Sequence, residues 1–221
     1  MTEQPIYTIK LLRRRPLSEK SFEIDLTRPD HFDFAAGQRV RFLLGEAARD
    51  YSMISAPADA VFSFCIRQVI GGLLSPQLAT AARGTRFRVS GPHGYFTFKS
   101  PQGKAVFVAT GTGIAPFVSM ARSGVSGFLL VHGVRQPSEL YYETFLREAA
   151  GQYIPCLSGR ETEISSVAGA FAGRVTDYLK DRLERDVYDF YLCGRSEMIR
   201  DATLLVDEHF PGSLVYAESF D

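Results

Sequence analysis

Cysteine is scarce in this chain of 221 residues, and its cysteines form no metal-binding pattern. The three residues Cys65, Cys156 and Cys193 are widely spaced and odd in number. Disulfide frameworks use even sets of cysteines, and metal or iron–sulfur sites use closely spaced ones. We therefore expect neither a disulfide framework nor a bound metal, and a reducing cytoplasm is the expected compartment.

Long apolar runs, a signal peptide and a net charge are absent as well. No run approaches the roughly 18 apolar residues that span a bilayer. The start, Met1-Thr2-Glu3-Gln4-Pro5, lacks the basic-then-apolar order of a signal peptide. Basic and acidic residues number 25 each, so the composition favours neither nucleic acid nor membrane insertion. We also expect a monomer.

The charge is unevenly divided along the chain. Residues 1–100 hold 14 basic and 9 acidic residues, a net charge of +5, and residues 101–221 hold 11 and 16, a net charge of −5. The basic residues of the first half either attract an acidic partner or are ordinary surface residues exposed to water.

The first hundred residues contain short apolar and alternating segments, which are typical of strands. Gly, Pro and Asp turns separate these segments, which predicts a small antiparallel barrel. One short helix is expected at Ser75–Ala82. The expected strands are Tyr7–Arg13, Ser21–Leu26, Arg39–Leu44, the stretch around Tyr51–Ile54, Val61–Ile70, Thr85–Ser90 and Tyr95–Thr97.

The pattern changes at Ser100-Pro101-Gln102-Gly103. Beyond it, apolar strands alternate with helical stretches, which predicts an α/β domain with a parallel sheet and helices on both faces. We therefore expect domains at residues 1–99 and 100–221. The expected strands are Ala105–Ala109, Gly127–His132, Tyr153–Leu157, Asp189–Cys193 and Ser213–Ala217, and the expected helices are Pro116–Arg122, Leu140–Ala150, Val175–Glu184 and Glu197–His209.

Arg49-Asp50-Tyr51-Ser52 offers a cation, an aromatic ring and a hydroxyl in one short stretch. A flat ligand with a phosphate suits this set, because Tyr51 can lie against a ring and Arg49 can bind a phosphate as a planar fork. Ser52 can donate a hydrogen bond to a ring heteroatom. The alternative is an ordinary strand with a surface ion pair and a half-buried tyrosine.

Two glycine-rich stretches each precede a predicted helix. Gly71-Gly72-Leu73-Leu74-Ser75 is either a phosphate-binding turn or a plain turn in which Ser75 caps the helix. Thr110-Gly111-Thr112-Gly113-Ile114-Ala115-Pro116 follows a buried strand, which is the context of a nucleotide-binding loop. Pro116 replaces the last glycine of the dinucleotide fingerprint and suits the first turn of a helix. The alternative is a tight connection without a ligand.

Two further stretches lie at strand ends. Cys193 stands at the end of a predicted strand, directly before Gly194, so Cys193 is either a small buried hydrophobe or a ligand contact. Glu218 and Phe220 close the chain after a predicted strand, and the tail is either ordered or frayed.

Taken in order, these motifs resemble the ferredoxin–NADP reductase superfamily over essentially the whole chain. They are Arg49-Asp50-Tyr51-Ser52, Gly71-Gly72-x-x-Ser75, Gly111–Pro116, Cys193-Gly194 with Met198, and Glu218-x-Phe220. The resemblance implies a flavin-binding antiparallel barrel followed by a nicotinamide-nucleotide domain, with FAD and NADP (or NAD) meeting between them. His93 stands where the family more often has an aromatic residue, so it either contacts flavin or fills a turn.

The resemblance also implies roles for single residues. In the flavin domain, Arg49, Gly72 and Ser75 would hold the pyrophosphate with Gly71 in the same turn, Tyr51 would stack on the isoalloxazine, and Ser52 would bond near its N5. In the nucleotide domain, Thr110, Gly111, Thr112 and Gly113 would receive the dinucleotide, and Cys193 and Glu218 would flank the nicotinamide. Phe220 would cover the second face of the flavin.

The function that follows is a flavin-dependent NAD(P)H oxidoreductase. It would pass hydride to FAD and then electrons to a separate carrier such as ferredoxin or flavodoxin. A flavin reductase that releases reduced flavin, and a non-catalytic electron-transfer subunit, are the alternatives. NADPH is the expected donor, because Arg135 and Arg160 follow two strands of the nucleotide domain and Ser158 stands nearby. No acidic residue directly ends either strand, although Glu161 follows Arg160.

Overall fold

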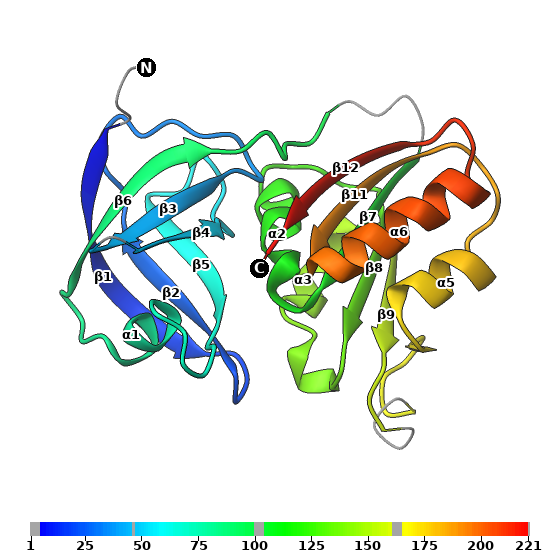
Figure 1. Cartoon of the computed structure of the whole chain (residues 1–221), viewed down its shortest axis with the longest axis horizontal. Coiled ribbons are helices and arrows are strands. Elements are labelled where there is room, and N and C mark those ends of the chain that lie inside the picture. The colour runs from blue at the N-terminus through cyan, green and yellow to red at the C-terminus, as the bar shows by residue number, and fades with distance from the viewer. Residues whose placement is uncertain (1–4, 46, 100–103, 161–164, 221) are drawn as a thin grey trace. The chain divides into compact units, whose positions relative to one another are not determined.

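The computed structural model describes residues 5–45, 47–99, 104–160 and 165–220. These residues form two compact units, one of residues 1–98 with 115–123 and one of residues 99–114 with 124–221 (Figure 1). Ser100–Gly103, where the sequence changes character, lies outside the described residues, as do Glu161 and Asp221.

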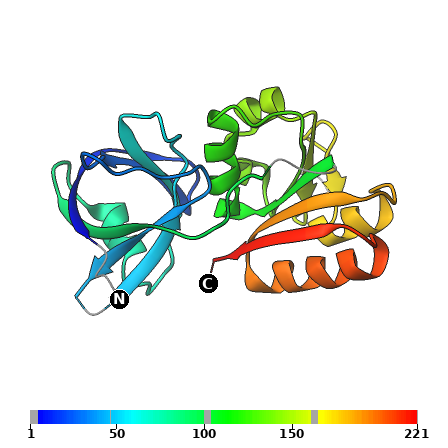
Figure 2. The same ribbon diagram turned by 90° about the horizontal axis from the view of Figure 1, so that it is seen from above.

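The first unit is built on six antiparallel strands in the order β4-β3-β6-β1-β2-β5. Directly after β4, the Ile54 N–H donates to the Ser63 carbonyl on β5 at 2.8 Å, so the two edges of the sheet approach each other. Figure 2 shows this curved sheet from above. The strands are β1 (Ile6–Pro16), β2 (Ser21–Thr27), β3 (Arg39–Leu44), β4 (Ala47–Ser52), β5 (Val61–Arg67) and β6 (Arg86–His93), and the one short helix is α1 (Ser75–Thr80).

Phenylalanine rings fill the inside of this curved sheet. Phe42 and Phe64 meet edge to face with ring centroids 5.4 Å apart, and Phe62 lies 4.9 Å from Phe32 in the same way. All four rings are buried. Edge-to-face pairs add a specific geometry to the hydrophobic gain of burial, and they hold β3 against β5.

Helix α2 (Ala115–Arg122) groups with this first unit. The Ser119 hydroxyl donates to the Ser55 carbonyl at 2.6 Å, and Arg122 pairs with Asp59 at 2.8 Å. A buried hydrogen bond and a partly exposed ion pair therefore join α2 to the segment between β4 and β5.

The second unit is a six-stranded parallel sheet in the order β10-β9-β8-β7-β11-β12. Helices α5 and α6 pack on one face, and Figure 2 shows α3 on the other. The strands are β7 (Lys104–Thr110), β8 (Leu129–Val134), β9 (Gln152–Leu157), β10 (Phe171–Ala172), β11 (Tyr188–Gly194) and β12 (Leu214–Ser219), and the helices are α3 (Glu143–Ala149), α5 (Val175–Asp181) and α6 (Ser196–His209).

The antiparallel domain followed by a parallel α/β domain is confirmed. Several local expectations were wrong. Tyr95–Thr97 is not a strand, and the strand near Tyr51 is Ala47–Ser52. The helix expected from Leu140 begins only at Glu143, because Tyr142 adopts a left-handed conformation with φ of 59°. Among the described residues, no helix has the length and apolarity needed to cross a membrane.

Candidate functional site

The predicted flavin residues lie on β4, an edge strand of the antiparallel sheet. Tyr51 pairs with Val40 across to β3, and its ring meets Phe42 edge to face at 5.5 Å. Burial raises the pKa of Tyr51 to about 12, and the nearby Arg49 only partly opposes this. The Tyr51 phenol therefore stays neutral at physiological pH and offers an apolar ring with a hydroxyl at its end.

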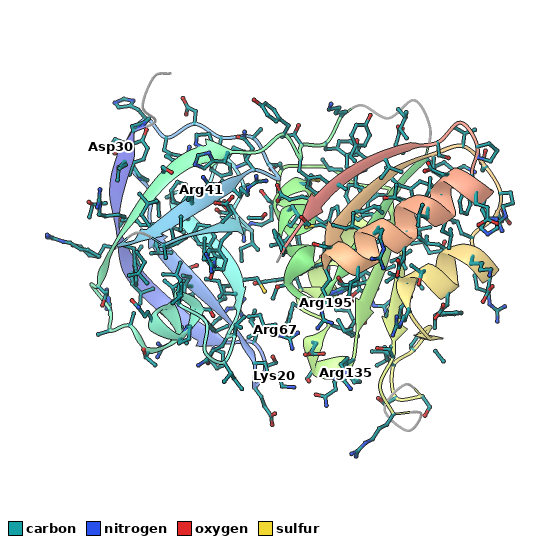
Figure 3. The ribbon with its side chains drawn as sticks, viewed as in Figure 1. Lys20, Asp30, Arg41, Arg67, Arg135 and Arg195 are labelled. Atoms are coloured by element: carbon teal, nitrogen blue, oxygen red, sulfur yellow. The ribbon has the colours of Figure 1, made fainter. Side chains whose placement is uncertain are left out.

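Asp50 points to the other face of β4 and holds two arginines of β3. Arg41 donates to both of its carboxylate oxygens, at 2.7 and 2.9 Å, and the Arg39 Nε donates at 3.0 Å (Figure 3 labels Arg41). Burial raises the pKa of Asp50, but these hydrogen bonds and charges outweigh it and hold the pKa below its usual range. Asp50 thus pairs with the guanidiniums of Arg39 and Arg41 on β3 rather than with that of Arg49.

Arg49 itself has no carboxylate partner among the described residues. Its guanidinium donates only to the carbonyl of the adjacent Ala48, at 2.7 Å. A guanidinium bonded to one carbonyl keeps most of its five donors. Arg49 therefore suits the phosphate role that the sequence assigned to it.

The Gly71–Ser75 turn differs from one of its two sequence interpretations. Ser75 does not cap α1, because the N-cap is Leu74 and no side chain caps the helix. The Ser75 hydroxyl instead accepts the Val69 N–H at 3.0 Å, while the Gly72 N–H donates to the Val69 carbonyl at 2.9 Å. Ser75 therefore shapes the turn in which Gly71 has a φ of +73° and no atom within 4 Å of the position that a Cβ would take.

Ser52 and His93 end their strands in the same sheet. Ser52 is buried at the end of β4, and Arg39 pairs with both Ser52 and His93. The His93 Nε2 lies 3.0 Å from the Ser90 hydroxyl. Burial lowers the pKa of His93, and Arg41 and Arg39 lower it further against the opposing charge of Asp50. His93 closes β6 rather than standing in a turn.

The predicted nucleotide loop leaves the parallel sheet at its switch point. From β7 the chain continues to β8 and β9 on one side, and later returns to β11 and β12 on the other. Ligands of such sheets bind at the carboxyl ends of the strands beside this point. Thr110 ends β7, and Gly111–Ile114 form a single 3-10 turn that runs into α2.

Two glycines bring the β7 loop and the end of β11 into contact. A Cβ on Gly113 would lie 2.3 Å from the Cys193 carbonyl oxygen, and one on Gly194 would lie 2.0 Å from the Thr110 hydroxyl. Neither position accepts a side chain without displacing backbone or a short neighbour. The sequence-predicted residues Thr110, Gly113 and Cys193 are thus brought together.

Gly111 is different, because no atom lies within 4 Å of the position that its Cβ would take. Its φ of +53° is left-handed, which favours glycine. Open space above a glycine at a strand end leaves room for a ligand next to backbone.

Glu218 and Phe220 lie beside the same strand end. In the β11–β12 register Glu218 is opposite Cys193, and the Phe220 N–H donates to the Gly194 carbonyl at 2.8 Å. The end of the chain is therefore held in place by backbone as far as Phe220. Glu218 and Cys193 are both buried.

Sequence reasoning missed two buried polar residues next to the loop. The His132 Nδ1 lies 2.9 Å from the Tyr153 hydroxyl, and its Nε2 lies 3.3 Å from the Gly111 carbonyl oxygen. In the sequence these residues are only a histidine within the apolar run of β8 and a tyrosine in β9. Nothing connects the two until the register of β8 with β9 is known.

Three arginines follow strands of the parallel sheet at its carboxyl edge. Arg135 follows β8, Arg160 lies beyond β9, and Arg195 follows β11 (Figure 3 labels Arg135 and Arg195). Each is exposed and has no ion pair with a described residue. The Ser158 N–H donates to the Val134 carbonyl at 3.1 Å, so the ends of β8 and β9 lie together.

An acidic residue does reach this edge, contrary to the sequence argument. The Glu139 carboxylate accepts the Arg135 backbone N–H at 3.2 Å. Glu139 lies in the 3-10 turn Pro137–Glu139, four residues beyond Arg135. The turn folds back on the strand end, which the linear spacing did not reveal.

Comparison with known proteins agrees with this arrangement. Residues 10–98 match the model of the oxidoreductase FAD-binding domain, and residues 107–203 match that of the oxidoreductase NAD-binding domain. The chain therefore has an FAD-binding domain and an NAD-binding domain of the kinds found in oxidoreductases.

The relatives narrow this class. The chain is 35% identical to ferredoxin–NADP reductase B of Sorangium cellulosum, over 68% of this chain and 67% of that protein. It is 32% identical to the ferredoxin–NAD(P)+ reductase component of the naphthalene 1,2-dioxygenase system of Pseudomonas putida, over 99% of this chain. A ferredoxin–NADP+ reductase of Neisseria gonorrhoeae has the same fold, with a TM-score of 0.83 at 22% identity over 98% of this chain and 99% of that one. The chain belongs to the ferredoxin–NADP reductase superfamily.

The match to the oxygenase-system proteins is partial in length. The chain spans 66% of the Pseudomonas putida naphthalene reductase component, and 66% of the xylene/toluene monooxygenase electron transfer component of the same organism.

The buried His132 generates a prediction about pH. Burial lowers the pKa of His132 to about 4, and the Gly111 carbonyl only partly opposes this. An unfolded histidine titrates near 6.5, so between these values the unfolded chain binds more protons and the free energy of unfolding rises with pH. We expect wild type to lose up to about 3 kcal/mol from pH 7 to pH 4 that His132→Gln does not lose. Urea unfolding midpoints across this range measure the difference.

The matched control is His31→Asn, which changes an exposed histidine whose φ of 58° asparagine tolerates. It should keep the steep dependence of wild type. If the free energy of unfolding changes with pH in the same way in wild type and in His132→Gln, the lowered pKa of His132 is contradicted.

Proposed function

We propose that the protein is a flavin-dependent NAD(P)H oxidoreductase that delivers electrons to a separate one-electron carrier such as ferredoxin or flavodoxin. The observation that carries the proposal is the glycine loop at the switch point of the parallel sheet, in the same chain as an FAD-binding domain. Bound FAD supplies the chemistry that links a two-electron donor to a one-electron acceptor. Relatives named as reductase components of oxygenase systems support the same partner class.

The residues of the flavin domain bind and orient. Arg49, whose guanidinium donates only to the Ala48 carbonyl, would bind the pyrophosphate, and so would the turn that Ser75 shapes and in which Gly71 is open. Tyr51 would stack its ring on the isoalloxazine, and Ser52 would place a hydroxyl near the reactive edge of that ring system.

The residues of the nucleotide domain do the same for the dinucleotide. Gly111 leaves open space at the start of the loop, and Gly113 fixes the loop against Cys193. Cys193 and Glu218, which are buried and opposite each other in the β11–β12 register, would border the nicotinamide. Phe220, held by its bond to Gly194, adds an aromatic surface.

Anaerobic stopped-flow reduction of the FAD-loaded protein tests the proposed reaction. NADPH or NADH should bleach the flavin absorbance, and the reduced protein should then reduce ferricyanide and an added ferredoxin. Ser52→Ala should slow the bleaching more than it weakens FAD binding, because the hydroxyl acts at the reacting centre.

Two results would favour the alternatives. Flavin that stays oxidised with either nucleotide would indicate a non-catalytic subunit. Flavin that separates from the protein on gel filtration and leaves in reduced form would indicate a flavin reductase.

Tyr51→Ala should weaken FAD binding, since it removes a stacked ring together with its buried area. Stacking adds about 0.5–1.5 kcal/mol beyond the area term, so we expect a roughly tenfold or larger rise in the FAD dissociation constant. Equilibrium titration of the apoprotein measures it. Tyr95→Ala, at an exposed position, is the control. Unchanged affinity in Tyr51→Ala would remove this residue from the site.

We further propose NADPH as the preferred donor. The extra 2′-phosphate of NADPH is bound by cations, and Arg135 and Arg160 stand near the ends of the neighbouring strands β8 and β9. The hydrogen bond from the Ser158 N–H to the Val134 carbonyl joins these two strand ends. Glu139 supports the alternative, because a carboxylate at this edge can bind the ribose diol of NADH. However, the hydrogen bond from the Arg135 backbone N–H already occupies one oxygen of the Glu139 carboxylate. The guanidiniums of Arg135 and Arg160 also outnumber this single carboxylate.

Arg160→Ala should raise the Michaelis constant for NADPH roughly tenfold or more and leave that for NADH nearly unchanged, because a charge-assisted hydrogen bond contributes about 1.5–3 kcal/mol. Steady-state reduction of ferricyanide with each donor measures both constants. Arg182→Ala, an exposed arginine after α5, is the matched control. Faster wild-type reduction by NADH at equal low concentration would contradict the NADPH preference while leaving the proposed reaction intact.

A further inference from the structure

His132 lies in β8 and is completely buried, yet it carries two polar nitrogens. Both find partners: Nδ1 meets the Tyr153 hydroxyl at 2.9 Å and Nε2 meets the Gly111 carbonyl oxygen at 3.3 Å. A buried polar side chain with both ends satisfied is fixed in orientation. It therefore connects β9, β8 and the loop after β7.

Chemistry gives these two hydrogen bonds a direction. A carbonyl oxygen can only accept, so the Nε2 must carry the proton of a neutral imidazole. The Nδ1 is then an acceptor and receives a hydrogen bond from the Tyr153 hydroxyl. Burial holds the pKa of His132 near 4, so the imidazole is neutral at physiological pH. The Gly111 carbonyl thus fixes the tautomer, and the Tyr153 hydroxyl donates to the nitrogen that remains.

Tyr153 is itself anchored by residues of α3. The Arg147 guanidinium lies over its ring at 4.7 Å, and Arg147 donates twice to Glu143 at 2.8 and 2.9 Å. These residues belong to α3, which packs against β9. The tyrosine that donates to Nδ1 is therefore held by α3.

The bond to Gly111 sets the orientation of the next peptide. The Gly111 carbonyl and the Thr112 N–H belong to one planar trans peptide, so they point in opposite directions. Because His132 holds the carbonyl toward the sheet, the Thr112 N–H faces away from it. Gly111 itself has no atom within 4 Å of the position that its Cβ would take, and a phosphate accepts hydrogen bonds from backbone N–H groups that point outward.

We infer that His132 and Tyr153 are positioning residues that hold the 110–113 loop in its nucleotide-binding conformation through the Gly111 carbonyl. The inference rests on the proposed nucleotide role of this loop. Gly113 is fixed against Cys193 by close packing, so the loop is held at both ends. Without His132 the Gly111 peptide can rotate, and ordering the loop then costs free energy when the nucleotide binds.

Calorimetric titration of the FAD-loaded protein with NADP+, and separately with NAD+, tests this without turnover. Tyr153→Phe keeps the ring but loses the hydroxyl, and it should bind the nucleotide roughly fivefold more weakly, the scale of one hydrogen bond. His132→Asn keeps a polar group near Nδ1 but falls short of Gly111, so it should be at least as weak. His132→Gln places an amide N–H at the position of Nε2 and should restore most of the affinity.

The matched control is Tyr188→Phe in the same sheet. The Tyr188 hydroxyl donates to the Glu184 carbonyl at 3.0 Å, and Tyr188 stands at the opposite end of its strand, across from Lys104. This variant should lower the melting temperature but leave nucleotide affinity unchanged. The FAD content per chain is measured for every variant to confirm that the first domain is intact.

Three outcomes would count against the inference. It is overturned if Tyr153→Phe binds nucleotide as wild type does, or if Tyr188→Phe loses as much affinity as Tyr153→Phe. If His132→Gln binds the nucleotide no more tightly than His132→Asn does, the proposed role of the hydrogen bond from the His132 Nε2 to the Gly111 carbonyl is overturned. Wild type that binds neither nucleotide would instead overturn the proposed function, on which the inference depends.

Discussion

The close approach of Gly113 to the Cys193 carbonyl is the contact on which the nucleotide domain depends. A Cβ there would be 2.3 Å from that oxygen, so only glycine allows the β7 loop to pass the end of β11. The two strands lie side by side although about eighty residues separate them in the chain. This adjacency marks the switch point of the sheet, because the chain continues from β7 to β8 on one side and later returns to β11 on the other side of β7. The proposed place of the dinucleotide loop follows from this meeting of two strand ends.

The two domains present cofactor groups in different ways. The flavin domain uses side chains of one edge strand, where Arg49 and Tyr51 share a face of β4 and Asp50 draws Arg39 and Arg41 to the other. The nucleotide domain uses backbone, because its loop is mostly glycine and threonine. A ring system is recognised by stacking, which needs an aromatic side chain, and a phosphate by N–H groups, which every loop provides once side chains are out of the way.

Much of this arrangement could be predicted from the sequence, because its signals are local. Alternation in residues 21–26, the apolar run of β7 and the glycines that follow it each predict one element. Even the opposite faces of Asp50 and Tyr51 follow from a period of two. The domain order and the parallel sheet were predicted for the same reason: short strands without helices precede strands that alternate with helices.

What the sequence did not reveal is what depends on register and on turns. The helix expected at Leu140 begins three residues later, because Tyr142 leaves the right-handed region before it. Glu139 returns to the Arg135 N–H through a turn that spacing alone does not predict. Ser75 serves a neighbouring turn instead of its own helix. In each case one hydrogen bond or one backbone angle decided between local conformations of similar energy.

His132 shows the same limit at the site itself. A histidine within an apolar strand is costly to bury unless both nitrogens are satisfied, so its presence signals two partners without naming them. The register of β8 with β7 sets His132 opposite Ala109, one residue before the loop begins, and the register with β9 brings Tyr153 within reach. A shift of one residue in the β8–β7 pairing would turn the imidazole away from Gly111, and a shift of one residue in the β8–β9 pairing would turn Tyr153 away from the imidazole. The polar group is therefore tolerated in the core because the parallel pairing places both of its partners within reach, and the loop inherits its orientation from the sheet.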